Sequence, residues 1–208
     1  MVSLSWAEDD LLYLAGERAE HLYVLAAGRA KASRVTVNGQ EVVVDLLAPG
    51  DLFGGMRDLG QPTYLETVRA LTTTCALRID TRAFRGILSE YPEVALRVID
   101  DTTALLAQAR TDVTAQSTET VAQRVASGLL RLADKFGQDG ISGATLLQLP
   151  LSRTDLAAMT GSTPESVSRV MSQLRRDGVI DSGRRWTAIL DRDRLAATAS
   201  DGSGRPTP

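Results

Sequence analysis

Three polar residues late in the chain, Glu165, Ser168 and Arg169, have the types and the spacing that recognition of base-pair edges requires. Residues four positions apart share one face of a helix, so Glu165 and Arg169 can orient each other. An Arg side chain can donate two hydrogen bonds to guanine O6 and N7, and a Glu can accept one from cytosine N4. The alternative is a solvated ion pair worth roughly 0.2–0.5 kcal/mol. Base recognition is favoured only if the surrounding elements place this face in a groove.

A second group of residues could bind the phosphates of a nucleic-acid backbone. Ser152 and Thr163 each precede a predicted helix, and the amides at a helix N-terminus attract anions. Arginine side chains add charge for backbone contacts, which position a protein on a duplex. The candidate phosphate contacts are Ser152, Arg153, Thr163, Ser172 and Arg184, with Arg185 beside them.

The elements that must position these residues follow the pattern of a helix-turn-helix, two short helices joined by a glycine-containing turn. Ser152 is a good N-cap for a helix over 153–159, which ends at Thr160-Gly161-Ser162. Thr163 caps the second helix, with Pro164 as its first residue, and Gly178 ends it. The second helix therefore carries the candidate base contacts, and its predicted buried face comprises Val167, Val170, Met171 and Leu174.

Further elements flank the two helices. Residues 179–190 predict a hairpin, the wing of a winged helix-turn-helix, and residues from Ala196 to Pro208 predict a frayed polar tail. Upstream, Thr120 and Gln123 have the spacing of a capping box for a helix that reaches about Lys135. This helix is followed by a glycine-rich loop at 137–143 and a short strand at 146–150.

Pro92 can serve as the first residue of a new helix, and residues 93–117, which contain neither proline nor glycine, predict one long helix. Apolar and small residues recur along it in steps of three and four, close to the a and d positions of a coiled coil. A narrow seam on so long a helix favours the same helix of a second subunit as its partner; the alternative is packing on its own domain. The candidate dimerisation residues are Ile99, Thr102, Leu106, Ala109 and Val113.

Short β-rich runs separated by glycine turns fill residues 11–79. The clearest hairpin signal is Asn38-Gly39, which predicts a type I′ turn with positive φ at both residues. Strands at this spacing suggest a small β-barrel or jelly roll. We therefore expect an α+β protein, with an N-terminal β jelly-roll barrel over 1–92, a dimerisation helix over 93–117 and a winged helix-turn-helix over 118–208.

Composition argues against several classes of protein. One His and one Cys are too few for a cysteine-rich zinc site, a four-cysteine iron–sulfur cluster or a metal site of three histidines. The sequence lacks a Ser-His-Asp set and a Gly-Lys-Ser/Thr loop, so we expect no enzyme and no cofactor. No apolar run approaches the ~20 residues that span a bilayer, and the N-terminus lacks the basic start of a signal peptide. A cytoplasmic protein without a membrane partner is expected.

Charge is unevenly distributed along the chain. Residues 1–119 carry 11 basic and 17 acidic side chains, whereas residues 120–208 carry 12 and 9. The formal net charge of -3 therefore combines an acidic part with a basic part. Two domains with different partners would explain the change of sign, and so would chance.

The order of barrel, long helix and winged helix-turn-helix resembles the CRP/FNR superfamily of bacterial transcription regulators. Residues 15–25 are similar to its second-strand signature, residues 48–54 to the start of its phosphate-binding cassette, and residues 156–169 to its helix-turn-helix. The resemblance implies a homodimer on near-palindromic DNA, an allosteric ligand in the barrel, and contact with RNA polymerase through the barrel surface or exposed loops such as 137–143. The family's usual first strand is expected to be shortened or absent.

The cassette departs from the pattern of family members that bind cyclic AMP. Their ribose-binding Glu corresponds to Gly55, and their phosphate-binding Arg-Ser pair corresponds to Tyr64 and Leu65. Their adenine-facing hydroxyls correspond to Ala109 and Arg110. A phosphate buried without a paired cation would be unfavourable, so we expect no cyclic AMP binding in the usual way. Collapse of Tyr64, Leu65 and Arg110 into the pocket would support DNA binding without an effector; the candidate pocket residues are Gly54, Gly55, Tyr64, Leu65 and Arg110.

The reading helix also departs from the CRP type, because Pro164 replaces its first Arg. Glu165, Ser168 and Arg169 match instead the Glu-x-x-Ser-Arg pattern of the FNR branch. The resemblance implies TTGA(T/C)-like half-sites in inverted repeat, with Glu165 and Arg169 on the central G·C pair. The branch's iron–sulfur cluster cannot form, because Cys75 is the only cysteine. Structural roles are expected for Cys75 and for the single histidine, His21.

The sequence therefore predicts a homodimeric, sequence-specific DNA-binding transcription activator that does not depend on cyclic AMP. One alternative is a regulator of the same family that responds to haem, nitric oxide or another ligand in the barrel. A ligand-binding module without DNA function and an enzyme are the other two alternatives. The intact reading helix disfavours the former, and the lack of catalytic motifs disfavours the latter.

Overall fold

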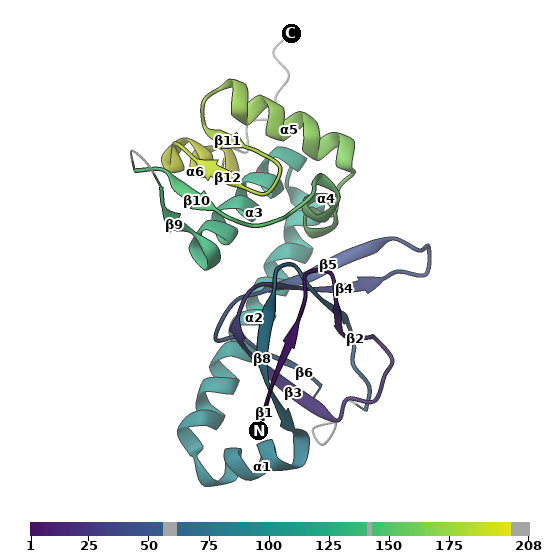
Figure 1. The fold of residues 1–208 in the computed structure, drawn as a ribbon. Helices are drawn as coiled ribbons and strands as arrows, with labels where there is room; N and C mark the ends of the chain where they lie inside the picture. The colour runs from purple at the N-terminus through teal and green to yellow at the C-terminus, as the bar shows by residue number, and fades with distance from the viewer. Residues whose placement is uncertain (56–61, 141–142, 201–208) are drawn as a thin grey trace. The chain divides into compact units, whose positions relative to one another are not determined.

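The computed structural model describes residues 1–55, 62–140 and 143–200. The chain divides into two compact units, residues 1–111 and 112–208. The first unit is rich in β-strands and includes most of a long helix, and the second packs helices against a small sheet (Figure 1). The predicted α+β class, with a β-barrel before the helices and a helix-turn-helix at the end, is confirmed.

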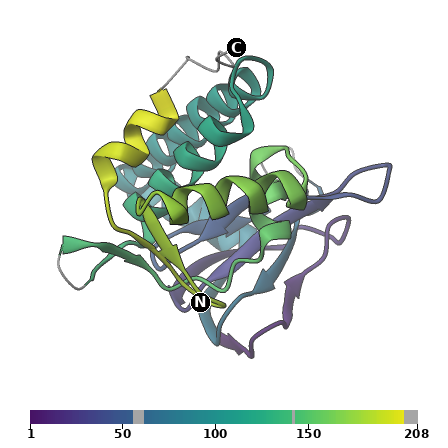
Figure 2. The same ribbon diagram turned by 90° about the horizontal axis from the view of Figure 1, so that it is seen from above.

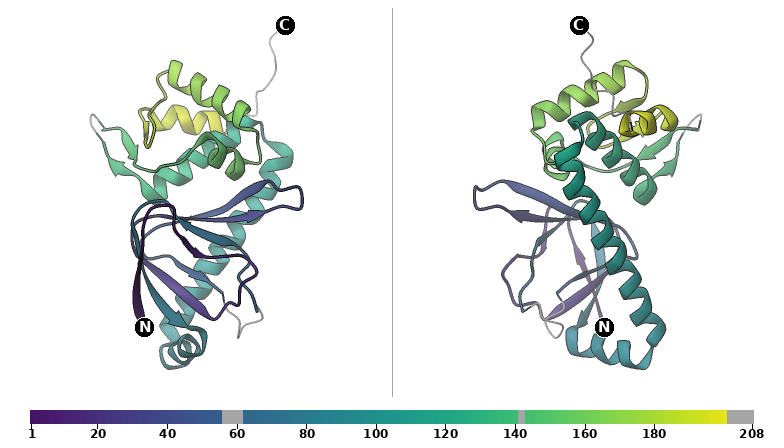
Figure 3. Two further views of the ribbon diagram at one scale, coloured as in Figure 1. Left: turned by 45° about the vertical axis from the view of Figure 1, so that its right-hand side comes forward. Right: turned by 180° about the vertical axis from the view of Figure 1, so that it is seen from behind.

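Eight strands among the described residues build the first unit as two antiparallel four-stranded sheets. One sheet has the order β1-β8-β3-β6 and the other β2-β7-β4-β5, and Figure 3 shows the β4–β5 hairpin extending beyond the barrel. Leu25 and Ala76 from the first sheet and Val68 and Ala32 from the second lie in one buried cluster. The strands are β1 Val2–Trp6, β2 Leu11–Tyr13, β3 His21–Ala27, β4 Ala30–Val35, β5 Glu41–Leu47, β6 Leu52–Gly54, β7 Thr67–Ala70 and β8 Thr74–Asp80.

Two predicted details of this unit are wrong. No strand is predicted before Leu11 and the first strand is expected to be shortened or absent, yet all five residues of Val2–Trp6 pair with β8. The Asn38-Gly39 turn is not type I′, because Gly39 has a positive φ of 76° and Asn38 does not. The Thr36 amide donates to the Gln40 carbonyl at 2.8 Å, which leaves a three-residue loop between them. Such a loop needs a left-handed residue only at its last position, and Gly39 supplies it.

Two helices follow the strands. Helix α1, Thr81–Glu90, begins at the N-cap Asp80, whose carboxylate accepts from the Arg82 amide at 2.9 Å. Phe84 of α1 packs with Leu22 and Ile79 on one face of the first sheet. Helix α2, Pro92–Thr118, begins at the predicted proline and ends one residue beyond the predicted range. Its turns from Asp112 onward belong to the second unit.

The second unit packs four helices against a sheet of order β11-β12-β10-β9. Val125 and Leu129 of α3, Val167 and Met171 of α5, and Leu195 of α6 are almost fully buried. Figure 2 shows α6 lying along α3. The elements are α3 Val121–Phe136, β9 Gln138–Asp139, β10 Thr145–Leu147, α4 Arg153–Thr160, α5 Pro164–Arg176, β11 Ile180–Ser182, β12 Thr187–Ile189 and α6 Arg192–Ser200.

The predicted frayed tail is wrong for the residues that are described. Residues 196–200 continue helix α6, because the buried Leu195 anchors that helix on α3 and Asp191 accepts from the Arg194 amide at 2.9 Å. An ion pair of 2.6 Å between Arg192 and Asp134 adds a second link to α3. Residues 201–208 of the predicted tail and 141–142 of the predicted loop lie outside the described residues.

Candidate nucleic-acid interface and barrel interior

Helices α4 and α5 form a helix-turn-helix whose ends are fixed by short-range hydrogen bonds. The Ser152 hydroxyl accepts from the Asp155 amide at 3.0 Å, and the Asp155 carboxylate accepts from the Ser152 amide at 2.9 Å, which is a capping box. Gly161 ends α4 in the left-handed conformation, with φ 58°. Thr163 then caps α5 by accepting from the Ser166 amide at 3.3 Å. The predicted caps and turn of this motif are confirmed.

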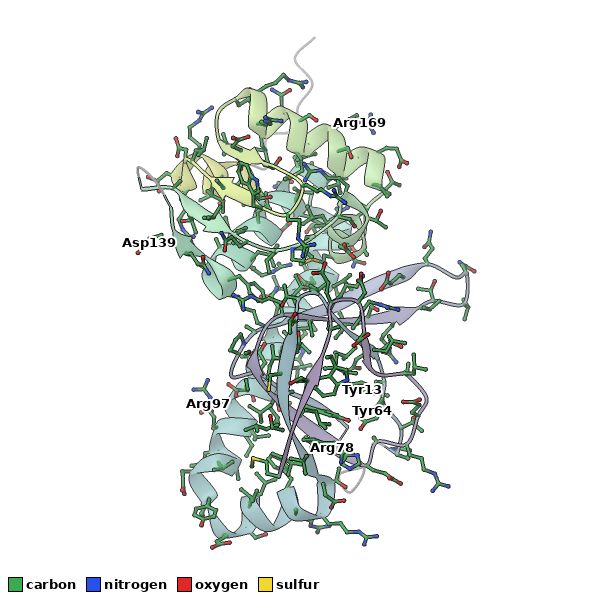
Figure 4. The ribbon with its side chains drawn as sticks, viewed as in Figure 1. Tyr13, Tyr64, Arg78, Arg97, Asp139 and Arg169 are labelled. Carbon is green, nitrogen blue, oxygen red and sulfur yellow. The ribbon has the colours of Figure 1, made fainter. Side chains whose placement is uncertain are left out.

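Helix α5 presents one buried and one exposed face. Val167, Met171 and Leu174 are buried, and Val170 is half-buried. Glu165 and Arg169 are exposed, and Ser168 is half-buried beside them. Figure 4 shows Arg169 projecting outward from α5. The three candidate base contacts therefore share one side of the helix, away from its buried face.

The predicted mutual orientation of Glu165 and Arg169 is not what the described residues show. Arg169 donates instead to the Ser166 hydroxyl at 3.2 Å. Ser166 in turn lies within 3.2 Å of the Thr163 hydroxyl, so the arginine is tied to the capped first turn of the helix. This arrangement leaves the Glu165 carboxylate available to a cytosine amino group.

The five candidate phosphate contacts differ in whether their polar groups are exposed or already hydrogen-bonded within the protein. Ser152 and Thr163 use their hydroxyls as helix caps, whereas Ser172 on α5 and Arg184 between β11 and β12 are exposed. Arg153 is half-buried and donates to the Ser182 hydroxyl of β11 at 3.3 Å. Burial lowers the pKa of the Arg153 guanidinium. Arg153 therefore links α4 to the wing hairpin, a role that the sequence did not suggest.

Sequence reasoning missed Arg124 of α3, which makes three hydrogen bonds around the helix-turn-helix. Its guanidinium donates to the Thr160 carbonyl at 2.7 Å, the Glu119 carbonyl at 2.6 Å and the Ser162 hydroxyl at 3.1 Å. Thr160 and Ser162 stand 36 and 38 residues away in the chain. The only local signal is the position of Arg124 in the first turn of a helix, which does not predict such distant acceptors.

Aromatic side chains fill the barrel at the candidate effector pocket. The rings of Tyr64 and Tyr13 stack with centroids 3.9 Å apart, and Tyr13 stacks on Tyr23 at 5.6 Å. Phe53 stacks on Tyr23 at 5.4 Å, and Trp6 meets Tyr23 edge-on at 6.2 Å. Figure 4 shows Tyr13 and Tyr64 together inside the barrel. Stacked and edge-on contacts between aromatic rings are favourable beyond the burial of their apolar area.

The hydroxyl groups of this cluster are shielded from water. Tyr64 donates to the His21 carbonyl at 3.1 Å. The Tyr13 hydroxyl is buried and has no hydrogen-bond partner among the described residues. The nearby Gly54 backbone lowers the pKa of Tyr13 slightly, but this effect is smaller than that of burial. Burial raises the pKa of Tyr13 and of Tyr64 well above the usual tyrosine value. Both hydroxyls are therefore neutral at physiological pH.

The two glycines of the cassette bring neighbouring chain segments close together. A Cβ on Gly55 would lie 2.0 Å from the Ala19 Cβ, and one on Gly54 would lie 2.9 Å from the His21 carbonyl oxygen. Gly54 also has a positive φ of 106°. Of the predicted pocket residues, Gly54, Gly55 and Tyr64 come together, whereas Leu65 and Arg110 are exposed.

The single histidine and cysteine are half-buried and separate. The His21 carbonyl accepts from Tyr64, and the Cys75 Sγ lies 3.3 Å from the Ser3 hydroxyl. No cluster of three His, Cys, Asp or Glu side chains suited to a metal ion occurs in the described part of the chain. No described helix is both long and apolar enough to cross a bilayer.

The candidate dimerisation residues are exposed in the single chain. Ile99, Leu106 and Val113 are 58%, 52% and 68% exposed, and they follow each other at intervals of seven along α2. Thr102 and Ala109 lie between them and are also exposed. Val98 packs instead on the β-sheet cluster around Leu22. Helix α2 thus has one side on the barrel and an uncovered apolar seam.

Comparison with known proteins agrees with this architecture. The family model of the cyclic nucleotide-binding domain matches residues 3–91, and that of the Crp-like helix-turn-helix domain matches residues 123–198. The nitrogen fixation regulation protein FixK of Azorhizobium caulinodans is 30% identical over 185 residues, which cover 88% of this chain and 72% of FixK. The CRP-like cAMP-activated global transcriptional regulator of Mycobacterium tuberculosis is 25% identical over 189 residues, covering 90% and 84%.

Solved structures of transcription regulators have a similar fold. FixK2 from Bradyrhizobium japonicum has a TM-score of 0.82 and 25% identity, covering 95% of this chain and 96% of that one. A CRP-family transcriptional regulator from Thermus thermophilus has a TM-score of 0.79 and 27% identity, covering 95% and 97%. Fold and site together define a two-domain regulator of transcription that carries a DNA-binding helix-turn-helix. The chain belongs to the CRP/FNR family.

Proposed function

We propose that this chain is a homodimeric activator that binds TTGA(T/C)-like inverted repeats and does not require cyclic AMP. The proposed independence from cyclic AMP rests on the stack of aromatic rings in the barrel. Tyr64 takes the place of a phosphate-binding arginine, and its ring stacks on Tyr13 at 3.9 Å. A cyclic nucleotide would have to separate these rings, and its phosphate would meet an uncharged tyrosine at position 64 in place of a cation.

The proposal of a dimer rests on the exposed seam of α2. Ile99, Leu106 and Val113 repeat at the seven-residue interval of a coiled-coil a position, and Thr102 and Ala109 hold the d positions. Small d residues allow two helices to approach closely. The same helix of a second copy would cover the seam and set two reading helices side by side for an inverted repeat.

The proposed half-site follows from the exposed face of α5. Glu165, Ser168 and Arg169 have the Glu-x-x-Ser-Arg order of the FNR branch. Arg169 can donate to guanine and Glu165 can accept from the cytosine of the same pair. Activation would follow from contact with RNA polymerase, for which exposed residues such as Asp139 of β9 are candidates (Figure 4).

Selection of binding sites from random DNA, followed by gel shifts with and without cyclic AMP, tests the proposal. We expect enriched sites with two inverted TGA half-sites and the same affinity in both conditions. Calorimetry with cyclic AMP should show no binding, with the cAMP-activated Mycobacterium tuberculosis relative as the positive control. Transcription in vitro with bacterial RNA polymerase should rise when the protein is added. Enriched sites without TGA, or DNA binding that needs cyclic AMP, would refute it.

A second candidate is a regulator of this family that responds to haem, nitric oxide or another ligand in the barrel. The buried Tyr13 hydroxyl favours it, because this group has no hydrogen-bond partner among the described residues and a small polar ligand could supply one. The absorbance spectrum of the purified protein checks for haem. A ligand that alters operator affinity only while Tyr13 is present would favour this second candidate.

A further inference from the structure

Arg124 joins three segments of the second unit that are distant in sequence. Glu119 follows the end of α2, Thr160 is the last residue of α4, and Ser162 lies in the turn before α5. The Arg124 guanidinium donates to all three, at 2.6, 2.7 and 3.1 Å. Two of these acceptors are main-chain carbonyls at the ends of helical segments, where carbonyl groups lack an intrahelical donor.

The chemistry of a guanidinium explains why an arginine is suited to this place. Its planar group offers five N–H donors in a fixed geometry, so it can meet several acceptors at once. Hydrogen bonds from a charged donor are stronger than those between neutral groups. Arg124 is half-buried, so water competes with these acceptors less than at an exposed site. A lysine ammonium, a single point charge, could not match the same three positions.

Two further contacts attach the last turns of α2 to the same region. The Gln116 side chain lies 3.3 Å from the position that a Cβ on Gly161 would occupy, so it packs directly on the turn. Asp112 forms an ion pair of 3.0 Å with Arg131 of α3. Gln116 also follows Ala109 by seven residues and so continues the d positions of the proposed dimer seam. The end of the seam is therefore attached to the turn before the reading helix.

We propose that Arg124 is a positioning residue for DNA recognition, which fixes the turn before α5 against the end of the dimerisation helix. This inference rests on the proposed function. In a dimer, the orientation of each α5 relative to α2 determines whether both reading helices meet their half-sites together. Loss of Arg124 therefore weakens sequence-specific binding to an inverted repeat, while phosphate-driven binding to unrelated DNA is retained.

Gel shifts with the selected inverted repeat and with unrelated DNA test this role in Arg124→Gln and Arg124→Lys. We expect about a tenfold loss of operator affinity for Arg124→Gln, equivalent to about 1.4 kcal/mol, and partial recovery for Arg124→Lys. Affinity for unrelated DNA should change by less than about twofold. Hydrogen exchange should accelerate at Gly161 and Ser162, whose amides donate to Ala157, but not at the middle of α3.

The matched control is Arg192→Gln, which removes an ion pair with Asp134 from the same unit but away from the turn. It should leave the ratio of operator to unrelated-DNA affinity unchanged. If Arg124→Gln does not fold, Gln116→Ala combined with Ser162→Ala removes two side-chain contacts of the turn while keeping Arg124. That pair should still lower the ratio severalfold.

The outcomes separate the two proposals. If the unaltered protein shows no preference for any DNA sequence, the proposed function fails. If the unaltered protein prefers an inverted repeat but Arg124→Gln keeps the same affinity ratio, the positioning role is wrong. The same holds if both affinities fall equally, because that result would indicate a purely structural role.

Discussion

Arg169 has a long side chain on the exposed face of α5, and its guanidinium Nη2 donates to the Ser166 hydroxyl at 3.2 Å. This tether reduces the conformational freedom that the arginine loses on binding, so the guanidinium is oriented before DNA arrives. We predict that Arg169→Ala costs about 1–3 kcal/mol of specific binding and relaxes preference at the G·C pair of the half-site. Gel shifts and repeated site selection with the variant measure both effects.

Arg175→Ala is the control for this prediction. Arg175 lies on the same helix but is paired with Asp181 of β11 at 3.0 Å. Its loss should leave the selected sequence unchanged. An unaltered site preference in Arg169→Ala would argue against base recognition by that residue.

Tyr13 and Tyr64 make a matched pair for a second prediction, because they stack on each other and differ in hydrogen bonding. Tyr64→Phe removes the bond to the His21 carbonyl and should cost about 1 kcal/mol of unfolding free energy. Tyr13→Phe removes a hydroxyl without a described partner and should be neutral or stabilising by up to about 1 kcal/mol. Urea denaturation at neutral pH measures both, and equal losses in the two variants would contradict the assignment.

The same residues predict how stability depends on alkaline pH. Burial raises the folded-state pKa of Tyr13 and Tyr64 above that of the unfolded chain, about 10. Their contribution is therefore complete below about pH 10 and is lost as pH rises above it, because only the unfolded chain releases the protons. We expect unfolding free energy to fall between about pH 9.5 and 11, and to fall less steeply in Tyr13→Phe. A flat profile would show that these hydroxyls are accessible when folded.

For single residues, the sequence predicts the hydrogen bonds that are made to residues close by in the chain. The caps Ser152, Thr163 and Thr120 bond within three residues of themselves, so a short pattern suffices to find them. Arg124 bonds across 36 and 38 residues, and only the folded chain brings its acceptors together. The collapse of Tyr64 onto Tyr13 likewise depends on strands that are distant in sequence.

Among the elements, α2 gives the most direct prediction. A charge at the centre of its seam would have to be buried between two apolar helices, so Leu106→Glu should convert the dimer into a monomer. Sedimentation or size-exclusion chromatography measures the change. Ala104→Glu is the control, because residue 104 is exposed and lies away from the seam positions 102 and 106. A Leu106→Glu protein that remains dimeric would place the interface elsewhere.

The element boundaries show where local patterns are insufficient. Strand β1 gains its hydrogen bonds entirely from β8, more than sixty residues further along the chain. Helix α6 has a weak apolar pattern and is held by one buried residue, Leu195, together with the Arg192–Asp134 pair. Tertiary contacts therefore define both elements. By contrast, α2 was predicted to within one residue at its C-terminal end, because Pro92 and a long run without breakers define it locally.

For the whole molecule, the proposed dimer predicts a fixed spacing between half-sites. Two reading helices contact the same side of a duplex when their half-sites are about one helical turn apart. Inserting about 5 bp turns one half-site to the opposite side. The affinity for the duplex with the insertion should fall to the affinity for a duplex with a single half-site. Gel shifts measure both affinities. Equal affinity for both duplexes would indicate that the protein binds DNA as a monomer.

The uneven charge distribution also fits a molecule with two different tasks. Acidic side chains outnumber basic ones by 17 to 11 in residues 1–119, whereas basic side chains outnumber acidic ones by 12 to 9 in residues 120–208, where the helix-turn-helix lies. The net charge alone therefore says little about DNA binding, because the sign that matters is local.

The chain has two tryptophans, and each unit holds one of them. The Trp6 ring meets the Tyr23 ring edge-on within the barrel. The Trp186 Nε1 lies 2.3 Å from the position that a Cβ on Gly183 would occupy. Intrinsic fluorescence therefore carries a separate signal from each unit. In Trp186→Phe the emission reports only the barrel, and in Trp6→Phe it reports only the wing. The two variants allow denaturation of the barrel and occupation of the wing by DNA to be followed without an added label.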